Sequence, residues 1–86
     1  MAPARILVVD DEPHVRLLYK EELSEDGYDV LLSDGEDNVV ERILKEEPDV
    51  LILDIKLGQG VSGLDILQEV RGKGLELPVI LSTAYD

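Results

Sequence analysis

The sequence predicts an α/β domain in which a parallel β-sheet is covered by helices on both faces. Four short apolar runs alternate with three segments whose apolar residues have helical spacing. The apolar runs lack polar alternation, as is typical of strands that are buried on both faces. With 86 residues the chain is long enough for one small domain, so we expect a single domain over residues 1–86.

The first predicted strand covers residues 5–9, and Pro13 marks the start of the helix that follows. Gly27 stands where a helix is commonly followed by glycine. Apolar side chains recur at helical spacing between these two points, and they are Val15, Leu18, Tyr19 and Leu23. We therefore expect an amphipathic helix whose apolar face packs on the sheet.

The second strand is predicted over residues 28–32. Asp34 and Asp37 resemble an N-terminal cap pair for the next helix, which Pro48 would end. The apolar face of that helix would consist of Val39, Val40, Ile43 and Leu44. The most apolar strand follows over residues 50–53 and leads directly into Asp54.

The last predicted helix begins after Ser62, which forms a capping-box pattern with Asp65. This helix would end at Gly72 or Gly74, and the fourth strand would cover residues 78–83. Parallel strands joined by helices need right-handed crossovers, so the order of elements predicts helices on both faces of one sheet.

Composition excludes several classes of protein. The chain has 20 acidic and 8 basic side chains and a net charge of −12, which argues against binding to nucleic-acid phosphates or an anionic membrane. It has no cysteine, so disulfides and thiolate metal sites are excluded. No apolar run approaches the roughly 20 residues that span a bilayer. The amino terminus leads straight into a strand and has no secretory signal, so we expect a soluble, cytoplasmic domain.

Acidic residues follow the first and third predicted strands. Asp10 and Asp11 come after the first strand, and Asp54 comes after the third. If these strands are neighbours, their carboxylates meet at the carboxyl edge of the sheet, where ligands bind in open parallel sheets. Negatively charged carboxylates that meet there repel one another, and this repulsion favours the binding of a hard cation such as Mg²⁺. A lone aspartate at a strand end is more often a turn residue or helix cap, but the combination favours a metal site. Glu12 fits a solvated first-turn acid better than a metal ligand.

The chain resembles the receiver domain of bacterial two-component response regulators. The resemblance is carried by residues 6–13, 48–56, 62–65 and 78–84. It implies a flavodoxin-like, doubly wound fold with strand order 2-1-3-4-5. Of this order the present sequence would supply 2-1-3-4 and lack the final helix, strand and helix.

The resemblance also implies roles for individual residues. Asp54 would accept a phosphoryl group from a sensor histidine kinase or a phosphotransfer protein. Thr83 would form a hydrogen bond with that group and report its presence, and the small Ala84 would leave room for it. A shift of one residue would put Ser82 in the place of Thr83. The implied ligands of Mg²⁺ are Asp10, Asp11, Asp54 and the backbone carbonyl of Lys56. The module would be a switch rather than a turnover enzyme.

The sequence departs from the family in two places. Leu57 and Gly58 stand where members often have Met-Pro, and one additional residue precedes Gly63. No residue matches the lysine that ends the family's fifth strand. Without the last helix, the strands over residues 7–9 and 51–53 should be partly bare, and the fourth strand should be an open edge. We therefore expect the chain either to self-associate or to be part of a longer protein.

Two other functions fit parts of the sequence. One is a receiver-like module for protein assembly, in which truncation has removed the switch. The other is a small phosphatase with an aspartyl nucleophile. Such enzymes usually carry a second acid two residues after the nucleophile, and Lys56 at that position argues against this alternative.

Overall fold

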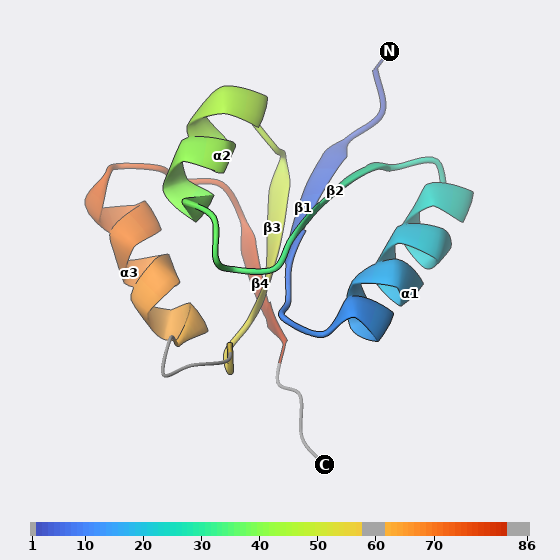
Figure 1. Cartoon of the computed structure of the whole chain (residues 1–86). Helices are drawn as coiled ribbons and strands as arrows, with labels where there is room; N and C mark the ends of the chain where they lie inside the picture. The colour runs from blue at the N-terminus through green and yellow to red at the C-terminus, as the bar shows by residue number, and fades with distance from the viewer. Residues whose placement is uncertain (1, 58–61, 83–86) are drawn as a thin grey trace.

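The computed structural model describes residues 2–57 and 62–82. Its elements follow one another in the predicted order (Figure 1), and they are β1 (Arg5–Val9), α1 (Pro13–Glu25), β2 (Asp29–Ser33), α2 (Val39–Glu46), β3 (Val50–Asp54), α3 (Gly63–Gly72) and β4 (Val79–Ser82). The strands form one sheet in the order β2-β1-β3-β4, and every neighbouring pair is parallel. This confirms the predicted fold class and strand order.

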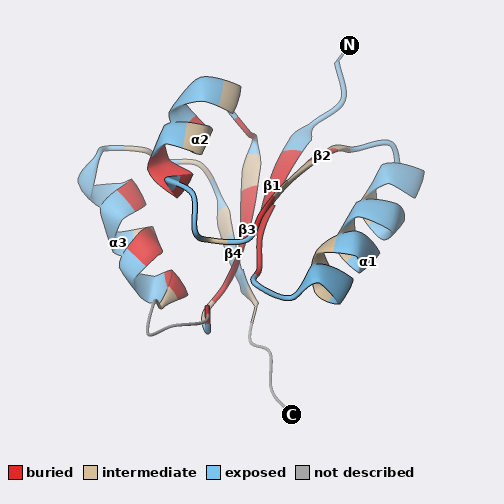
Figure 2. Ribbon diagram, viewed as in Figure 1, coloured by how far each residue is buried: buried red, intermediate tan, exposed pale blue. Residues whose placement is uncertain are grey.

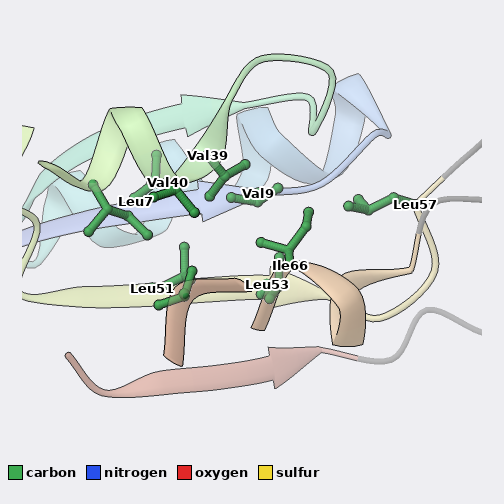
Figure 3. Close-up of a cluster of buried hydrophobic side chains, with 10 residues drawn as sticks. Leu7, Val9, Val39, Val40, Leu51, Leu53, Leu57 and Ile66 are labelled. Atoms are coloured by element: carbon green, nitrogen blue, oxygen red, sulfur yellow. The ribbon is translucent and has the colours of Figure 1, made fainter. Parts of the chain in front are cut away.

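The sheet lies between two helical layers, with α2 and α3 on one face and α1 on the other (Figure 1). Alternate residues of the central strands enter the two cores. Leu7 and Val9 join the cluster under α2 and α3, whereas Ile6 and Val8 join the cluster under α1. Figure 3 shows the larger cluster, in which Leu51 and Leu53 of β3 also take part. Burial on both faces explains why these strands have no polar alternation.

The expectation that residues 7–9 and 51–53 would be partly bare is wrong. Each of these residues is at most 8% exposed. Accordingly, β1 and β3 are coloured mainly as buried in Figure 2. They lie on β1 and β3, the two inner strands, where side chains from both neighbouring strands and from the helices close around them. Exposure falls instead on β4, at the edge of the described sheet, where Ile80 is 55% and Leu81 is 39% exposed.

Helix α1 makes a narrower contact with the sheet than its sequence predicts. Tyr19 and Leu23 pack against the cluster on its side, but Leu18 is 57% exposed, so its assignment to the packed face is wrong. In the part of the chain that the structure describes, that cluster contains four buried strand residues, and two side chains of α1 suffice to cover them. None of the residues of α1 is itself buried.

The start of α2 also differs from the prediction. Its N-cap is Asn38, whose side-chain oxygen accepts a hydrogen bond of 3.1 Å from the backbone N–H of Glu41. Asp34 instead forms a local turn, because its carboxylate accepts from the N–H of Glu36 at 2.8 Å. The prediction of an Asp34–Asp37 cap is therefore wrong, because α2 begins after Asn38. Ser62 is confirmed as the cap of α3, since its hydroxyl accepts from the N–H of Leu64 at 3.1 Å. The reciprocal hydrogen bonds of a capping box with Asp65 are not found among the described residues.

Candidate functional site

The acids that follow β1 and β3 come together at the carboxyl edge of the sheet. The register pairs Val9 of β1 with Leu53 of β3, so the next residue of each strand is an aspartate. One carboxylate oxygen each from Asp10, Asp11 and Asp54 lies within 4.8 Å of the other two. The predicted convergence of these three side chains is therefore confirmed.

The three carboxylates differ in their exposure to solvent. Asp10 is 3% and Asp54 is 2% exposed, whereas Asp11 lies on the surface. Burial raises the pKa of Asp10, and the nearby negative charges of Asp54 and Asp11 raise it further. The N–H of Glu12, which donates to the Asp10 carboxylate at 2.9 Å, opposes this rise, as does the charge of Arg16. The cluster therefore holds negative charge at an energetic cost.

Arg16 also belongs to this site, although no motif of the sequence points to it. Its guanidinium donates a hydrogen bond of 2.7 Å to the backbone carbonyl of Asp10, across the first turn of α1. The sequence places Arg16 in the predicted helix, four residues after Glu12. It does not show the bend at Asp11, which brings the start of this helix close to the Asp10 carbonyl.

The backbone after β3 orients the Asp54 side chain. The N–H of Lys56 donates to one Asp54 carboxylate oxygen at 3.1 Å, and Lys56 is paired with Ser62 in an isolated antiparallel bridge. From the described residues, the second oxygen of Asp54 receives no hydrogen bond. Leu57, one of the residues that depart from the family pattern, is 7% exposed and belongs to the core under α2 and α3.

Gly63 is required by the close approach of α3 to the end of β3. A Cβ atom added there would lie 2.0 Å from the Asp54 carbonyl oxygen and 3.0 Å from the Cα atom of Ile55. The N–H of Gly63 also donates to the Ile55 carbonyl at 2.7 Å. The sequence indicates this glycine only as part of a motif, because a single sequence does not show which backbone approaches it.

The donor set fits a magnesium ion. Oxygens around an octahedral Mg²⁺ lie about 3–4 Å apart, because each is about 2 Å from the metal. Three carboxylate oxygens within 4.8 Å of one another need only small rotations to reach that spacing. The buried carboxylates of Asp10 and Asp54 offer oxygen ligands only, as a hard cation prefers.

The predicted phosphoryl-sensing residues Thr83 and Ala84 lie outside the described residues. The strand that leads to them does end at the site, because Ser82 is the register partner of Asp54. The Ser82 carbonyl accepts a hydrogen bond of 2.9 Å from the N–H of Ile55, which fixes the end of β4 beside the end of β3.

Residues 6–86 match the family model of the response regulator receiver domain. The chain belongs to this family. Because the match covers nearly the whole chain, membership does not depend on any single motif. Receiver domains are signalling domains, and this assigns the chain to two-component signalling.

Solved receiver structures share the fold. The response regulator TrrA from Thermotoga maritima, solved in complex with Mg²⁺ and BeF, is 42% identical with a TM-score of 0.85, and the match covers 96% of this chain and 71% of that one. The BeF3-activated N-terminal receiver domain of RstA from Klebsiella pneumoniae is 33% identical with a TM-score of 0.84, over 95% of this chain and 68% of that one.

A third similar structure is the receiver domain of a putative LuxO repressor protein from Vibrio parahaemolyticus, at 28% identity and a TM-score of 0.85. The match covers 98% of this chain and 64% of that one. The present chain thus spans about two thirds of the length of these receiver chains. None of the helices in the described residues has the length and apolar character needed to cross a membrane.

Proposed function

We propose that this chain is the phosphoacceptor module of a two-component phosphorelay, with Asp54 as the acceptor. The observation that supports this most directly is the meeting of three carboxylate oxygens at the end of β3, two of them from nearly buried aspartates. Membership of the receiver family and the similarity to the Mg²⁺-bound TrrA structure support the same assignment.

In the proposed reaction an oxygen of Asp54 attacks phosphorus. A new O–P bond forms as the P–N bond of a phosphohistidine breaks, and the released imidazole takes up a proton. A carboxylate is a weak nucleophile toward an anionic group, so positioning and charge neutralisation must supply most of the acceleration. The hydrogen bond from the Lys56 N–H holds one Asp54 oxygen, which leaves the other to face the donor.

Asp10, Asp11 and Asp54 are the proposed side-chain ligands of Mg²⁺, and the backbone carbonyl of Lys56 is the proposed fourth protein ligand. When bound, Mg²⁺ would neutralise the charge of these acids and of the transferred phosphoryl oxygens. The Asp10 carboxylate is buried at the end of β1 and accepts a hydrogen bond from the N–H of Glu12, which holds it in place. Thr83 is proposed to form a hydrogen bond with the phosphoryl group, as the family pattern implies.

The proposed donor is a sensor histidine kinase or a phosphotransfer protein. The chain would carry the signal by being phosphorylated and later dephosphorylated, and it would not act as a turnover enzyme. We assign residues 1–86 to one receiver unit of this kind, and its cytoplasmic location stays a prediction.

The experiment is incubation with acetyl phosphate, with and without Mg²⁺, followed by mass measurement of the intact protein. The expected result is a gain of one phosphoryl group that requires Mg²⁺ and disappears in Asp54→Asn. Asp26→Asn is the matched control, because Asp26 is an exposed aspartate at the far end of α1. A folded protein that gains no mass would contradict the proposal, and so would an Asp54→Asn variant that is still labelled.

Self-association is a second candidate function, favoured by the exposed apolar residues of β4. Ile80 is 55% exposed on the strand that borders the described sheet. Such a strand can pair with another chain. Light scattering at micromolar concentration tests this, and a compact monomer that unfolds cooperatively would exclude it.

A further inference from the structure

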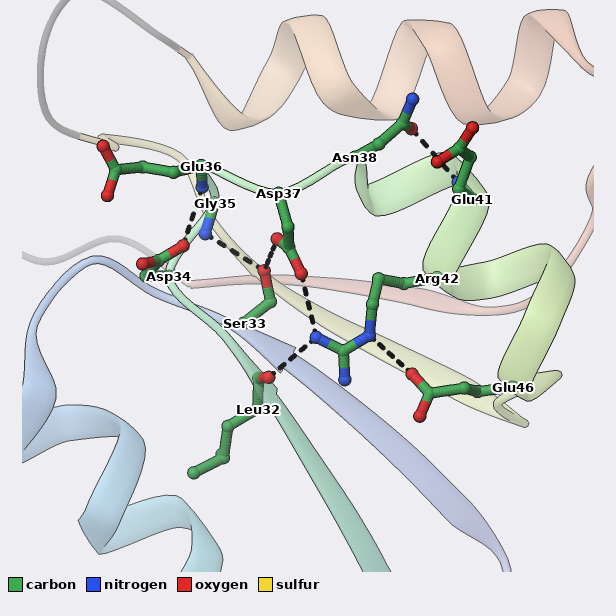
Figure 4. A network of polar contacts seen from close by, with 10 residues as sticks. All are labelled: Leu32, Ser33, Asp34, Gly35, Glu36, Asp37, Asn38, Glu41, Arg42 and Glu46. Carbon is green, nitrogen blue, oxygen red and sulfur yellow. Dashed lines mark hydrogen bonds and ion pairs between the residues drawn. The ribbon is translucent and has the colours of Figure 1, made fainter.

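A chain of hydrogen bonds outside the acidic site connects α2 to Asp10 through the end of β2. Arg42 of α2 lies at one end of this chain, in the polar network of Figure 4. Its guanidinium donates to the Leu32 carbonyl at 3.0 Å and to the Asp37 carboxylate at 2.9 Å. A further bond of 2.5 Å joins it to Glu46. Arg42 is thereby held in one geometry across the end of β2.

The Asp37 carboxylate connects Arg42 to Ser33 at the end of β2. The other oxygen of the Asp37 carboxylate accepts a hydrogen bond from the Ser33 hydroxyl. The same hydroxyl accepts from the N–H of Gly35 at 3.0 Å, which closes the turn after β2 (Figure 4). Ser33 is 4% exposed, so few other groups can replace these partners.

Ser33 in turn holds the backbone of the metal site. Its carbonyl accepts a hydrogen bond of 3.0 Å from the N–H of Asp10, one residue beyond the last register pair of β1 and β2. A shift of the end of β2 therefore shifts the backbone from which the Asp10 carboxylate projects. Outer residues that orient metal ligands commonly affect affinity strongly.

We propose that Arg42 is a positioning residue for the metal site, acting through Ser33 on the backbone of Asp10. This inference rests on the proposed Mg²⁺ site and assigns it a support on α2. Neither Arg42 nor Ser33 touches the metal or the phosphoryl group in this proposal.

The sign of the effect separates positioning from simple electrostatics. Arg42→Gln removes a positive charge from a protein of net charge −12, so a purely electrostatic effect would tighten the binding of a cation. Loss of positioning would weaken it. Ser33→Ala changes no charge and keeps the carbonyl that holds Asp10, so it tests the same link without an electrostatic contribution.

The experiment measures the Mg²⁺ dissociation constant of the full chain by calorimetric titration, and follows the amide signal of Asp10 by NMR. The dissociation constant should rise about three- to tenfold in Arg42→Gln and in Ser33→Ala, at or below the lower end of the effect usual for outer-shell partners. Arg42→Lys keeps the positive charge but loses the planar guanidinium with its several N–H donors, and it should give an intermediate dissociation constant.

Arg71→Gln is the matched control. Arg71 also uses its guanidinium to bridge two backbone carbonyls, those of Leu75 at 2.9 Å and Leu77 at 2.8 Å, and it has the same charge. This variant should lose stability without weaker Mg²⁺ binding. Equal or tighter binding in Arg42→Gln would overturn the proposal, and so would equal weakening in Arg71→Gln.

Three further outcomes of this experiment are decisive. If Arg42→Gln does not fold, Ser33→Ala alone decides, and unchanged binding in that variant overturns the proposal. If the unaltered chain binds no Mg²⁺ at all, the proposed function fails and this inference fails with it. If the unaltered chain binds Mg²⁺ and the variants bind it equally well, the positioning role of Arg42 is rejected and the proposed function stands.

Discussion

Replacing Gly63 by alanine would put a methyl group into the backbone at the end of β3. The added Cβ atom would be 2.0 Å from the Asp54 carbonyl oxygen and 2.8 Å from the carbon of that carbonyl. An ordinary contact between such atoms exceeds 3 Å, so either α3 or β3 must move by about 1 Å or more. Both neighbours are backbone and cannot turn aside as a side chain could.

The expected loss of unfolding free energy for Gly63→Ala is about 2–3 kcal/mol, in the range of overpacked sites. It is a large fraction of the roughly 5–15 kcal/mol that stabilises a whole domain. The displaced backbone also carries Asp54, so labelling by acetyl phosphate should fall in the fraction that remains folded. Urea denaturation measures the first effect, and intact mass measures the second.

Gly72→Ala is the matched control for this test. Gly72 lies in the same helix, and a Cβ atom there would meet nothing within 4 Å. Its replacement should raise the unfolding free energy by up to about 1 kcal/mol, because alanine favours a helix over glycine. If Gly63→Ala were as stable as Gly72→Ala, the close approach of α3 to Asp54 would be refuted.

Three other predictions concern charge and packing. Burial alone would raise the pKa of Asp37, but hydrogen bonds from Ser33 and Arg42 outweigh this effect and lower the pKa. The ionised Asp37 carboxylate therefore stabilises the fold at pH values above the ordinary pKa of 3.8. This stabilisation is lost as the pH falls through the lowered pKa. Asp37→Asn should therefore lower the melting temperature near neutral pH, and the difference should shrink below about pH 4. The pKa of Asp10 is raised, so its carboxylate destabilises the metal-free fold above that raised value, and the penalty disappears as pH falls below 3.8. Asp10→Asn should melt higher than the unaltered chain near neutral pH without Mg²⁺ and gain less from added Mg²⁺; a lower melting point would contradict this. Leu53→Ala, at a fully buried position, should cost about 2–5 kcal/mol in urea denaturation, and a loss below 1 kcal/mol would indicate a looser core.

The sheet could be predicted from the sequence because its signals are local. The runs ending in Val9 and Leu53 are apolar throughout, and both faces of these strands are buried as that pattern requires. The meeting of Asp10 with Asp54 also followed, because neighbouring parallel strands place their carboxyl ends at one edge.

The details that could not be predicted depend on neighbours that are distant in the sequence. The exposure of Leu18 depends on how much of the sheet α1 covers, which helical spacing does not encode. The cap at Asn38 and the role of Arg42 depend on the path of the chain after β2, where several polar residues could serve equally well. The roles of Lys56 and Thr83 stay predictions from the family pattern.

The bridge between Lys56 and Ser62 has a consequence for how this signalling module can diversify. The buried Leu57 and the helix cap at Ser62 are fixed points of the chain on either side of residues 58–61. A change of sequence between Leu57 and Ser62 that keeps both residues therefore leaves in place the backbone N–H of Lys56, which holds the Asp54 carboxylate.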